Sequence, residues 1–275
     1  MAVTPPSAPD PDDADDARPL DGDRTSTDAE RGLLRLTVLG SSGGYPAAGT
    51  ACSGYLVQGG GVNVVLDLGS GALANLQDHL ALADLDAVVL SHRHPDHWLD
   101  LGVLATAWRY GLGLDGLRVH GTSDTRVRAE PLLEGLTPTF EWTDIEAGDE
   151  LIIGGLTFTF SWTDHYVPTL ATRVSDGRAS IAYSADTGPG WSFAELGASI
   201  DLAVCEATHL ADLEPEGVLH LSARQAGAMA RTAGVGRLVL THLAPGVDPE
   251  ASRAEAAAAF GGEVDLAVTH ATFAV

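Results

Sequence analysis

The sequence predicts an α/β fold in which one domain covers residues 32–275. Short apolar strands alternate with helices and loops throughout this range, and many strands end in a His, Asp or Glu residue. In open α/β sheets, ligands bind at the edge formed by the carboxyl ends of the strands. Neither an internal repeat of solenoid length nor an evident linker interrupts the range, which is long enough to bury a large core.

Residues 1–31 differ from the rest of the chain in composition. They are rich in Pro, Asp, Ala and Thr, and Leu20 is almost their only large apolar residue. Such a segment buries too little apolar surface to offset the entropy lost on ordering. We therefore expect a disordered acidic leader over residues 1–31.

In the first half of the chain, apolar runs bounded by Gly, Pro and Asp predict strands, and apolar residues at helical spacing predict helices. The expected strands cover Leu33–Leu39, Gly54–Gln58, Val62–Leu68, Ala87–Leu90, Leu117–His120 and Phe140–Thr143. The expected helices cover Ala72–Leu82, Leu99–Tyr110 and Asp124–Gly135. Three consecutive glycines at 59–61 predict a hairpin between the second and third strands.

The second half begins with a β-rich run and then alternates strands with helices. The expected strands cover Glu150–Ile153, Leu156–Trp162, Leu170–Val174, Ser180–Tyr183, Asp201–Cys205, Arg237–Leu240 and Val264–Val268. The expected helices cover Ala223–Ala233, with Ser222 as a suitable N-cap, and the Ala-rich segment Pro249–Phe260. Strands of this length that alternate with helices are typical of an α/β domain.

The strand Ala87–Leu90 leads into the sequence His92-Arg93-His94-Pro95-Asp96-His97, which has the form HxHxDH. Neutral imidazole and carboxylate groups are the nitrogen and oxygen ligands that zinc prefers. A tight loop can direct alternate side chains at one ion and the next pair at a neighbouring ion. The motif therefore predicts half of a two-metal site rather than a polar surface loop.

Further polar residues at strand ends could converge with this motif on one rim. They are Asp67, His165, Asp186, Glu206 and His242. A carboxylate in the position of Asp67 more often hydrogen-bonds a neighbouring loop than binds a metal. We expect His79 at the surface and structural roles for His120 and His270, while His209 could lie at the rim or in an exposed loop.

With these residues, the chain resembles the metallo-β-lactamase superfamily across essentially all of residues 33–275. The pattern of that superfamily is HxHxDH followed by a lone His, a lone Asp and a lone His, and all seven positions are filled here. The resemblance implies a four-layer αβ/βα sandwich of two mixed sheets flanked by helices. It also implies one metal held by His92, His94 and His165, a second held by Asp96, His97 and His242, and Asp186 as the bridge.

Two further signatures resemble the ribonuclease Z branch of phosphodiesterases within this superfamily. They are Glu206-Ala207-Thr208 and His220-Leu221-Ser222-Ala223. The resemblance implies that Glu206 and His220 assist proton transfer to the leaving group, although His220 could instead be a polar residue at a helix N-terminus. True β-lactamases usually carry a Cys at the position of Asp186, and glyoxalase II adds a helical domain for which this chain has no room.

One departure from ribonuclease Z concerns the length of an insertion. Ribonuclease Z enzymes that bind tRNA commonly carry a long Gly/Pro-rich arm between the lone His and the lone Asp. Only 20 residues separate His165 from Asp186 in this chain. In this respect the sequence is more similar to arm-less actinobacterial members that have been proposed as cyclic-nucleotide phosphodiesterases.

The charge of the chain also argues against a large nucleic-acid substrate. It holds 38 acidic and 15 basic residues, all of the latter Arg, for a formal net charge of −23. Such a surface repels phosphate backbones unless the arginines cluster locally. The two cysteines, Cys52 and Cys205, lack CxxC spacing, and neither a signal peptide nor a long apolar run is evident. We therefore expect a cytoplasmic protein without a membrane segment.

These observations favour a binuclear zinc hydrolase that cleaves phosphodiester bonds. The expected substrate is small, such as 3′,5′-cyclic AMP, attacked by a hydroxide that bridges the metals. Asp96 would bind metal and orient the nucleophile, and His220, positioned by Glu206, would protonate the leaving group. Asp67 and Thr241 are candidates for orienting the metal ligands. Manganese or iron would accept much of the same ligand set as zinc.

Two other enzyme functions are compatible with the same residues. One is a ribonuclease Z-type endoribonuclease that processes tRNA 3′ ends, and the other is a thioester or lactone hydrolase of the same fold. A metal-free interaction module would have no need of a complete ligand set. The resemblance also suggests a homodimer.

Overall fold

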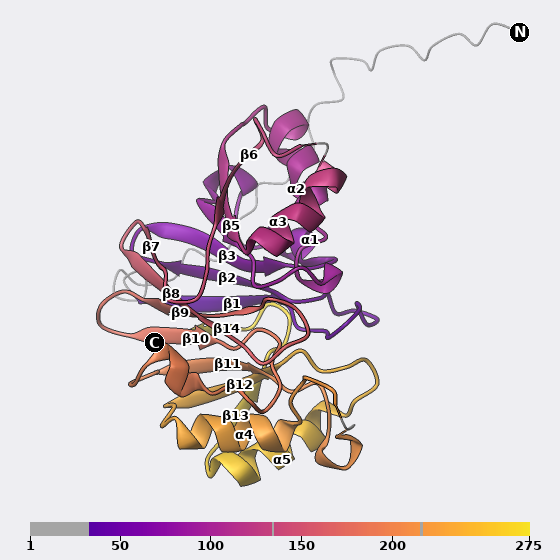
Figure 1. Cartoon of the computed structure of the whole chain (residues 1–275), viewed down its shortest axis with the longest axis vertical. Coiled ribbons are helices and arrows are strands. Elements are labelled where there is room, and N and C mark those ends of the chain that lie inside the picture. The colour runs from indigo at the N-terminus through magenta and orange to yellow at the C-terminus, as the bar shows by residue number, and fades with distance from the viewer. Residues whose placement is uncertain (1–32, 134, 215–216) are drawn as a thin grey trace, which may run out of the picture.

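Two seven-stranded mixed sheets pack face to face in the computed structural model, which describes residues 33–133, 135–214 and 217–275 (Figure 1). The first sheet has the order β14-β1-β2-β3-β4-β5-β6. Its strands are β1 (Arg35–Gly40), β2 (Gly54–Gly59), β3 (Val62–Leu68), β4 (Ala87–Val89), β5 (Leu117–Gly121), β6 (Phe140–Asp144) and β14 (Thr272–Ala274). The acidic leader expected over residues 1–31 lies outside the described residues.

The second sheet has the order β13-β12-β11-β10-β9-β8-β7. Its strands are β7 (Glu150–Ile153), β8 (Leu156–Trp162), β9 (Leu170–Ser175), β10 (Ser180–Tyr183), β11 (Leu202–Glu206), β12 (Arg237–Thr241) and β13 (Val264–Leu266). Strands β3 to β6 run parallel to one another, as do β10 to β13. Each sheet therefore has a parallel half, and the loops after its strands share one edge.

Helices cover the outer face of each sheet (Figure 1). The α-helices of the described residues are α1 (Ala72–Leu76), α2 (Leu101–Thr106), α3 (Ser123–Ala129), α4 (Ala223–Thr232) and α5 (Pro249–Phe260). Helices α1 to α3 pack on the first sheet through one apolar cluster, and α4 and α5 pack on the second through another. A third cluster fills the space between the sheets. The expected four-layer sandwich is confirmed.

The largest differences from the expected elements lie at helix ends. Helix α1 stops at Leu76 because the next amide groups bond to residues three positions back, as Gln77 does to Ala74. Helix α2 passes into a π-helical turn over Ala107–Gly111. Helix α3 gives way to a 3-10 turn that contains Pro131, which has no N–H to donate to a continuing α-helix.

Strand β14 was not expected. Its three residues pair antiparallel with β1, so that Ala274 lies opposite Arg35. The C-terminal segment thereby covers an edge strand of the first sheet, which limits unwanted pairing at that edge. Among the described residues, no helix has the length and apolar character that a membrane crossing requires.

His120 on β5 is buried without a hydrogen-bond partner on either ring nitrogen among the described residues. Burial, together with the charge of Arg118, lowers its pKa to about 4. Because the folded-state pKa lies below the unfolded value of about 6.5, the unfolded state binds a proton on this ring more readily than the folded state. Protonation therefore does not oppose folding above pH 6.5. Stability is lost as the pH falls from 6.5 towards 4.

We expect His120→Leu to reduce the loss of stability in acid. Between pH 7.5 and pH 5, the free energy of unfolding of the wild type should fall by about 2 kcal/mol more than that of the variant. Urea unfolding of both proteins in the presence of a chelator measures the difference and removes any contribution from metal binding. An identical decrease in both proteins would show that His120 is not responsible.

Candidate metal centre

The HxHxDH motif and the later strand ends meet at one edge of the sandwich. His92 to His97 follow β4 of the first sheet, whereas His165, Asp186 and His242 follow β8, β10 and β12 of the second. Among three overlapping groups of potential metal ligands, one of which joins His220 to Asp186 and His242, two clusters consist only of the expected positions. They are His92, His94, His165 and Asp186 in one cluster, and Asp96, His97 and His242 in the other. The structure thus brings together all seven positions expected to bind metal.

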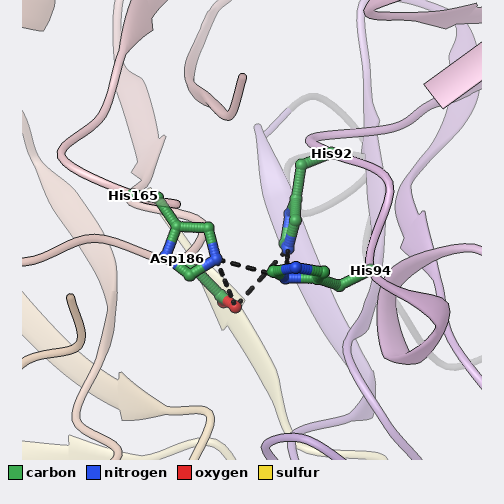
Figure 2. A group of neighbouring side chains, drawn as sticks. All are labelled: His92, His94, His165 and Asp186. Carbon is green, nitrogen blue, oxygen red and sulfur yellow. Dashed lines mark hydrogen bonds and ion pairs between the residues drawn. The ribbon is translucent and has the colours of Figure 1, made fainter. Parts of the chain in front are cut away.

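In the first cluster, the potential ligand atoms converge from opposite sides. Figure 2 shows His92 and His94 on one side, His165 on the other, and the Asp186 carboxylate between them. The Nδ1 atom of His94 lies 3.0 Å from Nε2 of His92 and 3.2 Å from Nε2 of His165. Oδ2 of Asp186 lies 3.5 Å from His92 Nε2 and 3.8 Å from His165 Nε2. Three nitrogens and one oxygen therefore surround one point.

The second cluster shares Asp186 with the first. Oδ1 of Asp186 lies 3.2 Å from Nε2 of His97 and 3.3 Å from Nε2 of His242. Oδ2 of Asp96 lies 3.5 Å and 3.3 Å from the same two nitrogens. The two oxygens of Asp186 therefore face different clusters, which is the arrangement that a bridging carboxylate requires.

The buried carboxylate of Asp67 orients two of these imidazoles. It accepts hydrogen bonds from the Ser91 amide at 2.7 Å, the Ser91 hydroxyl at 2.8 Å and the Tyr183 hydroxyl at 2.8 Å. Nδ1 of His97 lies 2.7 Å from the same carboxylate and must donate to it. Since Ser91 donates to Asp67, its oxygen accepts from Nδ1 of His92 at 3.0 Å. Both rings therefore leave Nε2 free to bind a metal.

The other two imidazoles that use Nε2 are fixed in the same way. Nδ1 of His165 donates to the Leu219 carbonyl at 3.0 Å. Nδ1 of His242 faces the Thr208 hydroxyl at 2.9 Å, which donates to Glu206 at 2.8 Å and so accepts from the imidazole. Thr208 thus has the orienting role that was expected of Thr241, whose hydroxyl instead contacts Tyr55.

Backbone geometry at the centre depends on unusual conformations. Asp67, Ala185 and His242 adopt positive φ angles of 55°, 50° and 56°, which are rare for residues other than glycine. At the end of β3, a Cβ on Gly69 would collide with the carbonyl group of Asp96. The absence of a side chain at Gly69 therefore lets the chain after β3 pass directly against the HxHxDH loop.

The chemistry of the donor atoms fits divalent metal ions. Nε2 of His97 and Oδ1 of Asp186 are buried without a hydrogen-bond partner among the described residues, and metal coordination would satisfy both. Burial opposes ionisation of Asp186, but His242, His97 and His92 hold its pKa well below the usual range. Burial likewise disfavours charge on His97, yet Asp186 and Asp67 raise its pKa well above 6.5. The centre therefore stabilises positive charge.

Glu206 and His220 form a pair beside the second cluster. The fully buried Glu206 carboxylate lies 2.9 Å from Nδ1 of His220 and accepts from the Thr187 and Leu221 amides. Burial alone would lower the pKa of His220, but the hydrogen bond and charge of Glu206 raise it to about 9. The His220 ring stacks on His242, with centroids 5.4 Å apart and planes 12° apart.

A cavity of about 280 Å³ opens over these groups and is called the metal cavity below. Asp96, Asp186, His220 and His242 line it. The amide of Gly44 holds Oδ2 of Asp96 at 2.8 Å from the opposite side. A small substrate in this cavity would contact potential metal ligands and His220, whose partner Glu206 is buried behind it.

The remaining histidines lie outside the metal cavity. His79 is exposed, as expected, but its Nε2 lies 2.9 Å from Nδ1 of His270, a contact that sequence reasoning missed. His209 is partly buried, and its ring centroid lies 6.3 Å from that of His220. It does not line the metal cavity.

Asp67→Asn is expected to weaken metal binding by roughly 10- to 100-fold while leaving the fold intact. An amide cannot accept all the hydrogen bonds that the Asp67 carboxylate accepts, so His97 and His92 lose their fixed orientation. Titration of the metal-free protein with zinc against a competing chelator measures the change. The matched control is Asp86→Asn, because Asp86 accepts a backbone hydrogen bond from Asn63 near the opposite end of β3. Equal affinity in both variants would contradict the assigned role of Asp67.

Comparison with known sequences identifies similar proteins over most of the chain. Residues 62–243 match the family described as the β-lactamase superfamily domain. Over 238 residues, the chain is 36% identical to the Bacillus subtilis protein named probable metallo-hydrolase YhfI, with 85% of this chain and 97% of that protein covered. Over 267 residues it is 30% identical to ribonuclease Z of Mycobacterium bovis, with 85% and 95% covered.

Solved structures agree with the sequence comparison. The crystal structure of YhfI from Bacillus subtilis matches with a TM-score of 0.82 and 32% identity, covering 89% of this chain and all of that one. The short form of human tRNase Z matches with a TM-score of 0.69 and 19% identity, covering 87% and 98%. The second likeness is one of fold alone.

Proposed function

Because this chain belongs to the metallo-β-lactamase superfamily and is a metallo-hydrolase, we propose that it is a binuclear zinc phosphodiesterase that acts on a small substrate such as 3′,5′-cyclic AMP. The observation that carries the proposal is His220 at the wall of the metal cavity, held from behind by the buried Glu206. It places a proton donor next to the bridging carboxylate Asp186.

The seven clustered residues would hold the metals in the two sets described above. Bound divalent ions would neutralise the oxygens of a phosphodiester and lower the pKa of a coordinated water towards about 7. Asp96 faces the metal cavity with one oxygen held by the Gly44 amide, which suits it to orient the attacking water. Asp67 and Thr208 keep the imidazole rings in position throughout.

His220 is the group best placed to protonate the leaving alkoxide. Its Nδ1 is engaged by Glu206, so its Nε2 is the nitrogen available to the substrate. Because the hydrogen bond and charge of Glu206 favour the protonated ring, His220 is suited to donate a proton as the bond to the leaving group breaks. A thioester hydrolase would have less need of such a donor, because a thiolate is a better leaving group than an alkoxide.

Three observations support a small substrate. The metal cavity holds about 280 Å³, and none of the arginines in the described segments lines it. The short stretch between His165 and Asp186 forms the hairpin β9–β10 within the second sheet, so it provides no extended arm.

Both free cysteines, Cys52 and Cys205, are buried, which suits the reducing cytoplasm that we propose as the location.

Cleavage of tRNA precursors is the second candidate function. The specific observation in its favour is the 30% identity to a protein named ribonuclease Z, over 95% of that protein's length. The negative charge of the chain and the hairpin in place of an arm count against it.

The test uses zinc-loaded wild type and Asp96→Ala, each incubated with 3′,5′-cyclic AMP and with a tRNA precursor. We expect the wild type to hydrolyse the cyclic nucleotide only, and the variant to be inactive on both. Cleavage of the precursor would show instead that the enzyme is an endoribonuclease. Activity on neither substrate, with two metals bound, would exclude both functions.

A further inference from the structure

A second cavity, of about 450 Å³, opens beside the metal centre and is called the aromatic cavity below. Trp162 and Tyr166 line it together with the potential metal ligand His165. The two aromatic side chains are 43% and 54% exposed. Large apolar rings that are exposed next to an active site mark a ligand-binding surface.

We propose that the aromatic cavity binds a nucleobase with an exocyclic amino group while the phosphodiester of the same molecule lies in the metal cavity. This inference rests on the proposed phosphodiesterase function and narrows its substrate class to nucleotides. It assigns Trp162 and Tyr166 as the residues that stack on the base and Glu146 as the acceptor for its amino group.

The aromatic rings provide stacking surfaces of the required kind. Every base has a π-face, and stacking on an aromatic side chain is favourable whatever the base. The hydroxyl of Tyr166 donates to the Gly217 carbonyl at 3.2 Å and accepts from the Leu219 amide at 2.8 Å. These bonds hold the ring in place before a ligand arrives, which reduces the entropy lost on binding.

The charges around the aromatic cavity favour hydrogen-bond donors over phosphate. Its lining includes the carboxylates of Asp124 and Glu146 and none of the arginines in the described segments. Arg93 pairs with Asp124 at 3.1 Å, whereas Glu146 forms no ion pair with another described residue. A carboxylate accepts hydrogen bonds from an amino group and repels a phosphate. The phosphodiester is therefore directed to the metals and the base to the aromatic cavity.

His165 lies between the two cavities: it lines the aromatic cavity, and its ring packs against that of His220, which lines the metal cavity, so a nucleotide that reaches across this ring occupies both. The His165 ring has its centroid 5.1 Å from that of Tyr166, on the aromatic side, and 5.0 Å from that of His220, on the metal side. The Leu219 carbonyl that orients His165 belongs to the same residue whose amide contacts Tyr166. The base would thus lie next to the group that protonates the leaving oxygen.

The test measures binding of adenosine, which has the base but no phosphodiester to cleave, to the zinc-loaded protein by calorimetry. Trp162→Ala should weaken binding by roughly 5- to 100-fold, because one stacking partner is lost. The matched control is Trp142→Ala, since Trp142 on β6 is partly buried and lines neither cavity. In turnover of cyclic AMP, Trp162→Ala should raise KM and leave kcat nearly unchanged, as expected for loss of uniform binding.

Comparison ligands make each outcome decisive. Inosine, which carries an oxygen in place of the amino group, should bind more weakly than adenosine, and equal binding would overturn the assignment of an amino group. Equal adenosine affinity in the two tryptophan variants, or tighter binding of tetramethylammonium than of adenosine, would overturn the nucleobase site. Adenosine binding that depends on Trp162, without hydrolysis of any cyclic nucleotide, would support the nucleobase site and refute the phosphodiesterase function.

Discussion

Asp186→Asn is expected to bind at most one metal ion per chain and to lose roughly 10³-fold in kcat/KM, since charge stabilisation by a two-metal site is worth several kcal/mol. The two oxygens of Asp186 face different clusters. A neutral amide offers one good donor oxygen and an NH₂ group that repels a cation, so the link between the clusters is lost. Elemental analysis of dialysed protein and turnover of cyclic AMP measure the two effects.

The matched control for this variant is Asp201→Asn. Asp186 follows the carboxyl end of β10, whereas Asp201 accepts a hydrogen bond of 2.8 Å from the amide of Ser180 at the other end of that strand. Circular dichroism should be unchanged in both variants, because the amide and the carboxylate have the same shape. Two metals and full activity in Asp186→Asn would rule out a bridging role.

His220→Gln should lower kcat for cyclic AMP by roughly 10²- to 10⁴-fold without loss of metal, the range typical for removal of a general acid. The ring of His220 lies beside the second cluster, but its Nδ1 is bonded to Glu206. Glutamine can accept or donate hydrogen bonds, but it cannot transfer a proton. Single-turnover measurements at saturating substrate separate this effect from weaker binding.

A change of leaving group distinguishes proton donation from a structural role. Bis(4-nitrophenyl) phosphate releases a phenolate that needs no proton, so its hydrolysis should fall much less in His220→Gln than that of cyclic AMP. His209→Gln, whose ring is near His220 but outside the metal cavity, should leave both rates close to wild type. Loss of metal from His220→Gln, or equal losses on both substrates, would make His220 a metal ligand or a structural residue.

The residues of the candidate centre were predictable from sequence because ligand types are conspicuous at strand ends. His92 to His97 stand within one short loop, and His165, Asp186 and His242 each follow an apolar run. The strands themselves were predictable for the same reason, since continuous runs such as Ala87–Leu90 are buried on both faces in a layered fold. The sheet order brings these strand ends to one edge.

The contacts that support the centre depend on pairings that a single sequence does not reveal. Strand β14 has only three residues, and its partner β1 lies at the other end of the described chain. Thr208 and Thr241 are both threonines near strand ends, yet only the Thr208 hydroxyl forms a hydrogen bond with the His242 ring. The Thr241 hydroxyl instead bonds the Tyr55 hydroxyl of the other sheet. The sheet face on which a side chain lies depends on the pairing register of its strand, since a shift of one residue moves every side chain of that strand to the opposite face. The group that orients His165 is the backbone carbonyl of Leu219, and a backbone contact cannot be predicted from the pattern of side chains.

The position of the centre between the two sheets has a consequence for how the molecule unfolds. The motif belongs to the first sheet and the remaining expected ligands to the second, so each bound ion would cross-link two halves that otherwise adhere through apolar packing and a few hydrogen bonds. An ion that binds only the folded state, at a free concentration of 1,000 times its Kd, adds about 4 kcal/mol to the free energy of unfolding. Metal supply in the cell would then affect the lifetime of the protein as well as its activity, because a metal-free chain unfolds more often and is exposed more often to proteases.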